Sequence, residues 1–331
     1  MLRKMKKVSK VSFAFVLMLA ILMSVPFTAL ATTKDERVVE DAVLILNDEI
    51  KQMGDIHIVD GRVYMAIGAI IPALSGSVAW DKVNREAVIM SKSDDKIVFG
   101  EDIPTVEFNG VRYELEAAPY SSDDRLYVPI RYIAEFLHAR VDWDSEEKAV
   151  TLTSLPLEIV SEQNSINQIS EKYNVSVQQL LSRNGYSNVN QVKDQSKLAY
   201  IIPSVLENKA KTYTEDEYKL LAKLVQVESG YESYEGQLAV ANVILNRVKH
   251  PAFPTSIEVV IYSGKQFPPA HNGKLDKSVP NASVLRATKD AMNGKNNVED
   301  AIYFFNPKVT KGSFWSSLEV IATIENHSFA K

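Results

Sequence analysis

The 331-residue chain contains no cysteine. This absence excludes a disulfide framework, a thiol nucleophile and a thiolate metal site, so stability must come from hydrophobic cores. Histidine is also scarce, and the five histidines are scattered without the paired spacing of metal ligands. They are His57, His138, His250, His271 and His327. We therefore expect no metal site and no other cofactor.

Long apolar runs are rare, and the one that stands out lies near the N-terminus. The run "FAFVLMLAILMSVPF" follows a basic segment and ends in "ALA" at residues 29–31, which predicts a secretory signal peptide over residues 1–31. The alternative is an uncleaved membrane anchor, but the run is short and Pro26 interrupts it. We expect an exported, extracytoplasmic protein with no stable membrane span after cleavage.

Clustered positive charge is absent from the rest of the chain. The formal net charge is −5, and removing the five basic residues of the signal segment would lower it to about −10. A nucleic-acid partner would require a basic stripe, so none is expected. With 46% hydrophobic and 24% charged residues, the chain has the composition of a globular protein long enough for two or three domains.

An internal repeat occupies the first part of the predicted mature chain. "GRVYMAIGAIIPALSGSVAWD" begins at Gly61 and "DRLYVPIRYIAEFLHARVDWD" begins at Asp124, an offset of 63 residues. Each copy predicts a strand, a short amphipathic helix and a hairpin that carries a Trp-Asp corner. Residues 35–153 resemble the "stalk" modules named after the copper amine oxidase N-terminal domain. The resemblance implies an α+β stalk domain of exported proteins, which could contact wall or spore-coat proteins.

A shorter module follows at residues 157–203. Two helices are predicted between short β segments, and Ser176 and Gln179 stand at the spacing of a capping box. Buried positions are expected at Ile166, Ile169, Tyr173, Val177, Leu180 and Leu181. The βααβ pattern with "YNVSVQQLLSRN" resembles LysM, a module that binds glycans containing N-acetylglucosamine, although "QNS" replaces the usual Gly-Asp-Thr turn.

A polar linker at residues 204–215 leads into the C-terminal region, residues 216–331. Thr214 at the end of the linker and Glu217 stand at the spacing of a capping box, which predicts the start of a helix. In the helix that follows, Leu221, Leu224 and Glu228 share one face, which should be buried. Burial and the negative end of the helix dipole both favour the protonated form of Glu228. Such a carboxyl group is suited to general acid catalysis.

The next predicted helix, "GQLAVANVILNRVKH", is apolar on most of its circumference and should be central. Asn242 and Asn246 break this pattern on one stripe. They could bind sugar groups in a cleft, or they could tie the helix to loops. Glu235 should lie ionised at the start of this helix, and Glu232 in the preceding loop should belong to a solvated rim.

The C-terminal motifs resemble the SleB-type cell-wall hydrolases, the spore cortex-lytic enzyme family. The resemblance covers residues 217–331 through "VESGYESYEGQ", "QF", "AIYFFNP" and "VIATIENHSFAK". It implies a lysozyme-like, mainly helical catalytic domain with small β elements, in which Glu228 is the catalytic acid. Here the motif reads "ESGYE", so Gly230-Tyr231 replaces the family's usual Arg-Gly pair. We expect substrate-binding roles for Glu235, Gln237, Asn242, Asn246, Gln266, Phe267, Tyr303 and Asn306.

The resemblance implies lytic transglycosylase chemistry on the glycan strands of peptidoglycan, in spore cortex or vegetative wall. One carboxyl group suffices, because the substrate supplies its own nucleophile. A hydrolysing muramidase or glucosaminidase would instead need a second carboxylate, Glu235 or Glu232. A zinc amidase and a non-catalytic wall or spore-coat binding protein are the further alternatives.

Overall fold

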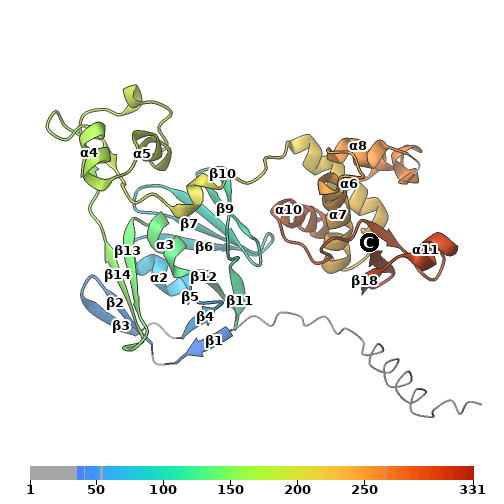
Figure 1. Ribbon diagram of the computed structural model, residues 1–331, viewed down its shortest axis with the longest axis horizontal. Coiled ribbons are helices and arrows are strands. Elements are labelled where there is room, and N and C mark those ends of the chain that lie inside the picture. Colours follow the sequence, from blue (N-terminus) through green and yellow to red (C-terminus); the bar gives the residue numbers. More distant parts are fainter. Residues whose placement is uncertain (1–35, 41, 53–54, 265) are drawn as a thin grey trace, which may run out of the picture.

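The structure is a computed structural model that describes residues 36–331, apart from residues 41, 53–54 and 265. The expected signal peptide lies outside the described residues. Figure 1 shows a β-rich N-terminal domain, a small module with two helices, and a mainly helical C-terminal domain. The prediction of a multidomain α+β protein is confirmed. No helix in the described part of the chain has the length and apolar character needed to cross a membrane.

The N-terminal domain, here called the stalk domain, contains three sheets and two short helices. The first sheet has the order β1 (Glu36–Val39), β4 (Ile56–Val59), β5 (Arg62–Ala66), β12 (Arg125–Pro129) and β11 (Tyr120–Ser122). The second has the order β10 (Val111–Glu114), β9 (Thr105–Phe108), β8 (Lys96–Gly100), β7 (Glu86–Met90) and β6 (Ser77–Asp81). The third has the order β13 (Ala139–Asp144), β14 (Ala149–Ser154), β2 (Val43–Leu46) and β3 (Glu49–Gln52), and the helices are α2 (Ile67–Ala73) and α3 (Ile130–Phe136).

The predicted repeat is confirmed as two copies of strand, helix and hairpin, β5–α2–β6–β7 and β12–α3–β13–β14. Each hairpin turns at its predicted Trp-Asp corner. Asp81 accepts hydrogen bonds from the backbone N–H groups two and three residues further on, at 2.9 and 3.0 Å, and Asp144 does the same at 2.8 and 3.0 Å. Side-chain capping of this kind satisfies the donors of a tight turn locally, so it can be read from sequence.

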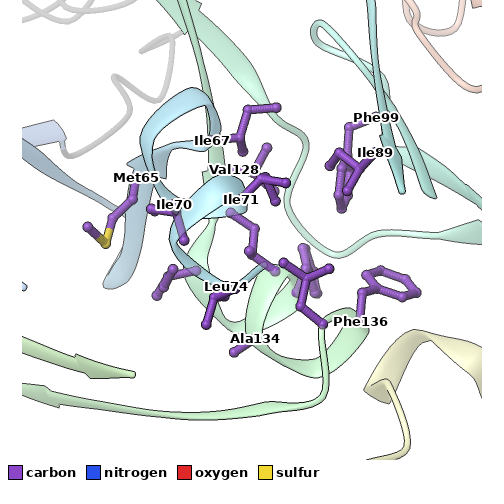
Figure 2. Close-up of a cluster of buried hydrophobic side chains, with 14 of the residues drawn as sticks. Met65, Ile67, Ile70, Ile71, Leu74, Ile89, Phe99, Val128, Ala134 and Phe136 are labelled. Atoms are coloured by element: carbon purple, nitrogen blue, oxygen red, sulfur yellow. The ribbon is translucent and has the colours of Figure 1, made fainter. Parts of the chain in front are cut away.

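The two copies share one hydrophobic core. The central strands β5 and β12 pair antiparallel, with Met65 opposite Val128, and these two residues are equivalent in the repeat. An approximate two-fold axis therefore passes between them. Figure 2 shows Ile70 and Ile71 of α2 and Phe136 of α3 among the side chains of this core. Burying each such side chain stabilises the fold by about 1.5–3 kcal/mol.

The small module consists of β15 (Glu158–Ile159), α4 (Ile166–Tyr173), α5 (Val177–Arg183) and β16 (Lys197–Leu198), with a 3₁₀ turn at Val189–Gln191. The capping box at Ser176 and Gln179 is present as predicted. Ile166, Ile169, Leu180 and Leu181 are buried as expected, whereas Tyr173 and Val177 are only partly buried.

A buried arginine fixes this module to the stalk domain. The side chain of Arg183 is 2% exposed, and its Nη1 donates to Asp95 Oδ2 at 2.8 Å. Nη2 donates to the carbonyl of Phe136 at 3.0 Å, and Nε donates to the carbonyl of Ile201 at 3.1 Å. Asp95 and Phe136 belong to the stalk domain and Ile201 belongs to the module, so Arg183 joins the two.

The C-terminal domain surrounds a central helix. Its helices are α6 (Glu215–Ser229), α7 (Tyr234–Lys249), α8 (Ile257–Tyr262), α9 (Lys274–Lys277), α10 (Ala282–Met292) and α11 (Ser313–Ser317), with a 3₁₀ turn at Pro268–Ala270. A small sheet has the order β17 (Tyr303–Phe305), β19 (His327–Ala330) and β18 (Val320–Ile324). The predicted capping box at Thr214 and Glu217 begins α6, and α7 is buried around almost all of its circumference, as expected.

The segment expected as a linker lies against the stalk domain. Residues 204–207 form a 3₁₀ turn, and the backbone then pairs with the edge strand β10. Glu114 N donates to the carbonyl of Asn208 at 2.8 Å, and Ala210 N donates to the carbonyl of Arg112 at 3.0 Å. Arg112 also donates from Nη2 to the carbonyl of Met292, at the end of α10, at 2.7 Å. The stalk domain therefore contacts the C-terminal domain directly.

Candidate active site

Glu228 lies in the last turn of α6 and lines a pocket of about 220 Å³. Leu221 and Leu224, on the same face of the helix, are fully buried, so the predicted helix geometry is confirmed. Burial raises the pKa of the Glu228 carboxyl group, and the charge of His327 opposes this rise. The group is thus biased toward the protonated form that a general acid requires.

The pocket is built from segments that are far apart in the sequence. Around Glu228 it is lined by residues of α7, of the 266–267 segment, of β17 and the loop after it, of α11 and of β19. These residues are Arg247, Gln266, Phe267, Phe304, Phe305, Asn306, Thr310, Trp315 and His327. Glu228 is the single carboxylate among the lining residues. Aromatic faces beside a few polar groups are typical of sites that bind sugars and other small ligands.

Glu232 lies behind His327 rather than in a solvated rim, so that prediction was wrong. The carboxylate of Glu232 is 3.0 Å from Nδ1 of His327, and the two side chains are 10% and 14% exposed. Gly236 makes room for it, because a Cβ atom at this position would come within 2.7 Å of Glu232 Oε2. The residues are 95 positions apart in the chain, and no local pattern links them.

Arg247 forms one wall of the pocket, and sequence reasoning missed it. It projects from the central helix α7, and its Nε donates to the carbonyl of Ile302 at 2.7 Å. Its guanidinium lies 5.4 Å from the ring centre of Phe267 and 5.9 Å from that of Tyr303. Burial lowers the pKa of Arg247 to about 10, which leaves it charged at neutral pH. A charged residue within an otherwise apolar helical stripe was the available signal.

Gln266, Phe267 and Asn306 are the expected binding residues that line the pocket with Glu228. Tyr303 lies beside it on β17, packed edge-on against Phe314 with ring centres 5.6 Å apart. The motifs around these residues therefore come together in space.

Asn242 and Asn246 do not line this pocket. Asn246 Nδ2 donates to the carbonyls of Val298 and Ala301, at 3.1 and 3.0 Å, and Asn242 Nδ2 donates to Asn297 Oδ1 at 3.3 Å. This geometry matches the second of the two interpretations of Asn242 and Asn246, in which their amides tie α7 to a loop. Buried amides need such partners, which explains why they interrupt an apolar helix.

Glu235 and Gln237 also lie outside the pocket. Glu235 is exposed in the first turn of α7, as expected, and its Oε2 accepts from Asn297 Nδ2 at 3.0 Å. Gln237 is buried, donates to the carbonyl of Glu232 at 2.8 Å and accepts from the Ser283 hydroxyl at 2.7 Å. Gln237 therefore holds the loop that carries Glu232.

Gly230 ends α6 in a right-handed conformation, with φ of −60° and ψ of −18°. The left-handed backbone typical of a glycine at a helix end is absent here. Gly230 is required for a different reason, because a Cβ atom would collide with the carbonyl and the side-chain amide of Gln226. The next residue, Tyr231, is fully exposed.

The histidines of the stalk domain have protein partners. His57 Nδ1 lies 2.6 Å from the Tyr120 hydroxyl, and His138 Nε2 lies 3.2 Å from the carbonyl of Pro156. Across the described part of the chain, no three histidine, aspartate or glutamate side chains converge as a metal site would need.

Comparison with known families assigns both main domains. Residues 231–330 match the family model described as Cell Wall Hydrolase, a range that begins three residues after Glu228. Residues 45–164 match the Copper amine oxidase N-terminal domain. The C-terminal domain is thus a SleB-type cell wall hydrolase domain, and it is preceded by a copper amine oxidase N-terminal-like domain.

The relatives of the C-terminal domain are spore cortex-lytic enzymes. The chain is 34% identical over 128 residues to the one from Bacillus subtilis, which covers 39% of this chain and 42% of that protein. It is 37% identical over 130 residues to the one from Oceanobacillus iheyensis, covering 39% and 46%. The chain thus matches less than half the length of these curated relatives.

A solved structure is similar in sequence to the same part of the chain. It is the catalytic domain of the germination-specific lytic transglycosylase SleB from Bacillus anthracis. The identity is 34%, the similarity covers 37% of this chain and 98% of that one, and the TM-score is 0.35.

Proposed function

We propose that this protein is an exported lytic transglycosylase that cleaves the bond between N-acetylmuramic acid and N-acetylglucosamine in peptidoglycan. The observation that carries the proposal is a single carboxyl group, Glu228, in a pocket of a cell wall hydrolase domain, with its pKa raised by burial. The names of the relatives favour spore cortex as the substrate. We further propose a lysozyme-like fold for this domain and an extracytoplasmic location.

Glu228 acts twice in the proposed reaction. It first donates its proton to the bridging oxygen, and the glycosidic bond breaks. The resulting carboxylate then accepts the proton of the muramyl C6 hydroxyl while that oxygen bonds to C1. A 1,6-anhydro ring forms and Glu228 regains its proton, so no water is consumed and no second carboxylate is needed.

The residues around Glu228 tune its pKa and bind the substrate in the proposed reaction. Glu232 holds the His327 side chain in place. The positive charge of His327 limits how far burial raises the pKa of Glu228. Arg247 supplies a fixed cation at the pocket wall, and its fork of donors suits hydroxyl and acetamido oxygens. Gln266 and Asn306 can bind the same groups, while Trp315 offers an apolar face to a sugar ring.

The other modules support binding to the wall. We propose that residues 157–203 form a LysM module that binds glycans containing N-acetylglucosamine, on the basis of the βααβ order and the sequence motif. The stalk domain is proposed as the part that contacts other wall or spore-coat components.

The reaction is tested by mass spectrometry of digests of purified spore cortex and of vegetative sacculi. A lytic transglycosylase yields anhydro-muramyl ends, which are one water lighter than the ends made by a hydrolysing muramidase. The alternative hydrolase would require Glu232 or Glu235 as a second carboxylate. The pairing of Glu232 with His327 leaves it poorly placed to activate water, and Glu235 lies outside the pocket. Fully hydrated ends would overturn the transglycosylase assignment, and intact glycan would favour a binding protein.

Glu228→Gln and Glu215→Gln are the matched variants for this digest. Both replace a glutamate by glutamine on helix α6, but Glu215 lies in the first turn and its side chain is 69% exposed. Loss of the anhydro products with the first variant alone would tie the chemistry to Glu228.

A further inference from the structure

The stalk domain contains two cavities that are related by its internal repeat. One, of about 610 Å³, brings Arg62 of the first copy to Trp143 of the second and is called the Trp143 cavity. The other, of about 640 Å³, brings Arg125 of the second copy to Trp80 of the first and is called the Trp80 cavity. At the 63-residue offset, the arginines are equivalent to each other, as are the tryptophans.

Each cavity combines residues of both copies because of the way the central strands pair. Because β5 and β12 run antiparallel about Met65 and Val128, the start of each strand lies beside the helix and hairpin of the other copy. Each cavity therefore combines an arginine from one copy with a tryptophan from the other. Core packing explains the apolar residues that the two copies share, but not an indole that lines a hollow beside an arginine at both equivalent positions.

The two cavities differ in how open they are. The Trp143 cavity is bordered by Ser204, Val205 and Asn208 of the segment that joins the domains, and Trp143 is half-buried. Trp80 is 41% exposed. Where the second copy has Arg131 and Tyr132, the first has the small residues Gly68 and Ala69, which leave the Trp80 cavity unfilled.

The surface around Trp80 continues beyond this cavity. An adjoining hollow of about 450 Å³ shares Trp80, Asp124 and Leu126 with it. It adds Asp123, two serines and Arg85, whose charge is paired with Glu101. Arg125 is exposed, and among the described residues its guanidinium has no ion-pair partner. An aromatic face is thus flanked along one groove by an unpaired and a paired arginine, two carboxylates and two serines.

This mixture of groups selects one ligand chemistry. A polyanion would be repelled by Asp123 and Asp124, and a polycation by Arg125. A pyranose ring presents an apolar C–H face to the indole and hydroxyl groups to donors and acceptors of both kinds. A chain of such rings would also use both hollows on either side of Trp80.

We propose that the Trp80 groove, formed by the Trp80 cavity and the adjoining hollow, binds a glycan strand of the cell wall. The choice of wall glycan rests on the proposed function, whereas the site itself rests on the geometry of the stalk domain. The Trp143 cavity is the equivalent site, similar in volume but bordered by larger side chains and by the interdomain segment.

The test uses the full chain with Glu228→Gln to prevent cleavage, and soluble peptidoglycan oligosaccharides as the probe. The indole N–H resonance of Trp80, assigned by its loss in Trp80→Phe, should shift on titration. Arg125→Gln should weaken the binding read from this resonance by about five- to tenfold, and Trp80→Ala should lower the total amount of oligosaccharide bound by the chain. Unchanged thermal unfolding of these variants would show that the fold is intact, as expected for exposed side chains.

Two results would overturn the proposal. An unmoved Trp80 resonance while the resonance of Trp315 in the hydrolase pocket shifts would exclude glycan binding in the groove. A shift produced by teichoic acid but not by the oligosaccharides would assign the groove to an anionic polymer. Failure of the proposed reaction is seen separately, in the product masses, and would not alter a Trp80 shift.

Discussion

The replacement Glu228→Gln separates the chemistry of the site from its shape. Glutamine has nearly the same size as glutamate but has no proton to donate at the bridging oxygen. Loss of a general acid lowers the rate by about 10²–10⁴-fold, which corresponds to roughly 2.7–5.5 kcal/mol of activation free energy. The pocket and its lining residues should stay in place, so binding of glycan should persist.

The same replacement should affect stability with a defined sign. Burial raises the pKa of Glu228, so the unfolded chain releases this proton at a lower pH than the folded protein does. The wild type therefore loses stability as the pH rises from the unfolded pKa to the raised folded pKa, and the loss is constant above that range. Glutamine has no such cost, so the variant should be at least as stable near neutral pH and relatively more stable at higher pH.

Two assays check these expectations together. The fall in turbidity of a cortex suspension measures lysis, and its rate for the wild type should decline as the pH rises through the pKa of Glu228. Thermal unfolding at several pH values measures stability. Full lytic activity in Glu228→Gln would refute the assignment of the acid, and a clearly less stable variant would refute the argument from burial.

Gly230→Ala should lower the free energy of unfolding by about 1–3 kcal/mol, because the new Cβ collides with Gln226, and lysis should fall as well; unchanged unfolding would contradict this packing. His327→Ala removes the charge that lowers the pKa of Glu228, so the alkaline limb of the pH–rate profile should move to higher pH, whereas an unmoved limb would exclude this coupling. Arg183→Met leaves the buried carboxylate of Asp95 without its partner and should cost about 3–5 kcal/mol by urea unfolding, and a loss below about 1 kcal/mol would argue against a buried ion pair.

Local patterns in the sequence predicted a large part of the fold. The capping boxes at Ser176 and Thr214 and the Trp-Asp corner at Asp81 are each satisfied within a few residues of the chain. The buried face of α6 follows from helical periodicity, which also placed Glu228. Such features need no knowledge of the rest of the protein.

The missed features depend on contacts between distant segments. His327 comes to Glu232 only when β19 packs beside the loop after α6, and nothing near either residue signals the pair. Asn246 was compatible with a cleft and with a buried tie until the 298–301 loop supplied its acceptors. Arg247 stood out as a charged residue in an apolar helix, but its place at the pocket depends on Phe267, Tyr303 and Ile302 from distant segments.

The pairing of residues 208–210 with β10 has a consequence for how the chain can be divided. Strand β10 is the outer strand of its sheet, and its unpaired backbone groups would otherwise be open to another chain. A fragment that stops before Asn208 would expose this template and should self-associate, whereas one that extends through Lys211 keeps it covered. Residues 208–210 thus connect the domains and also protect the edge of this sheet from pairing with another chain.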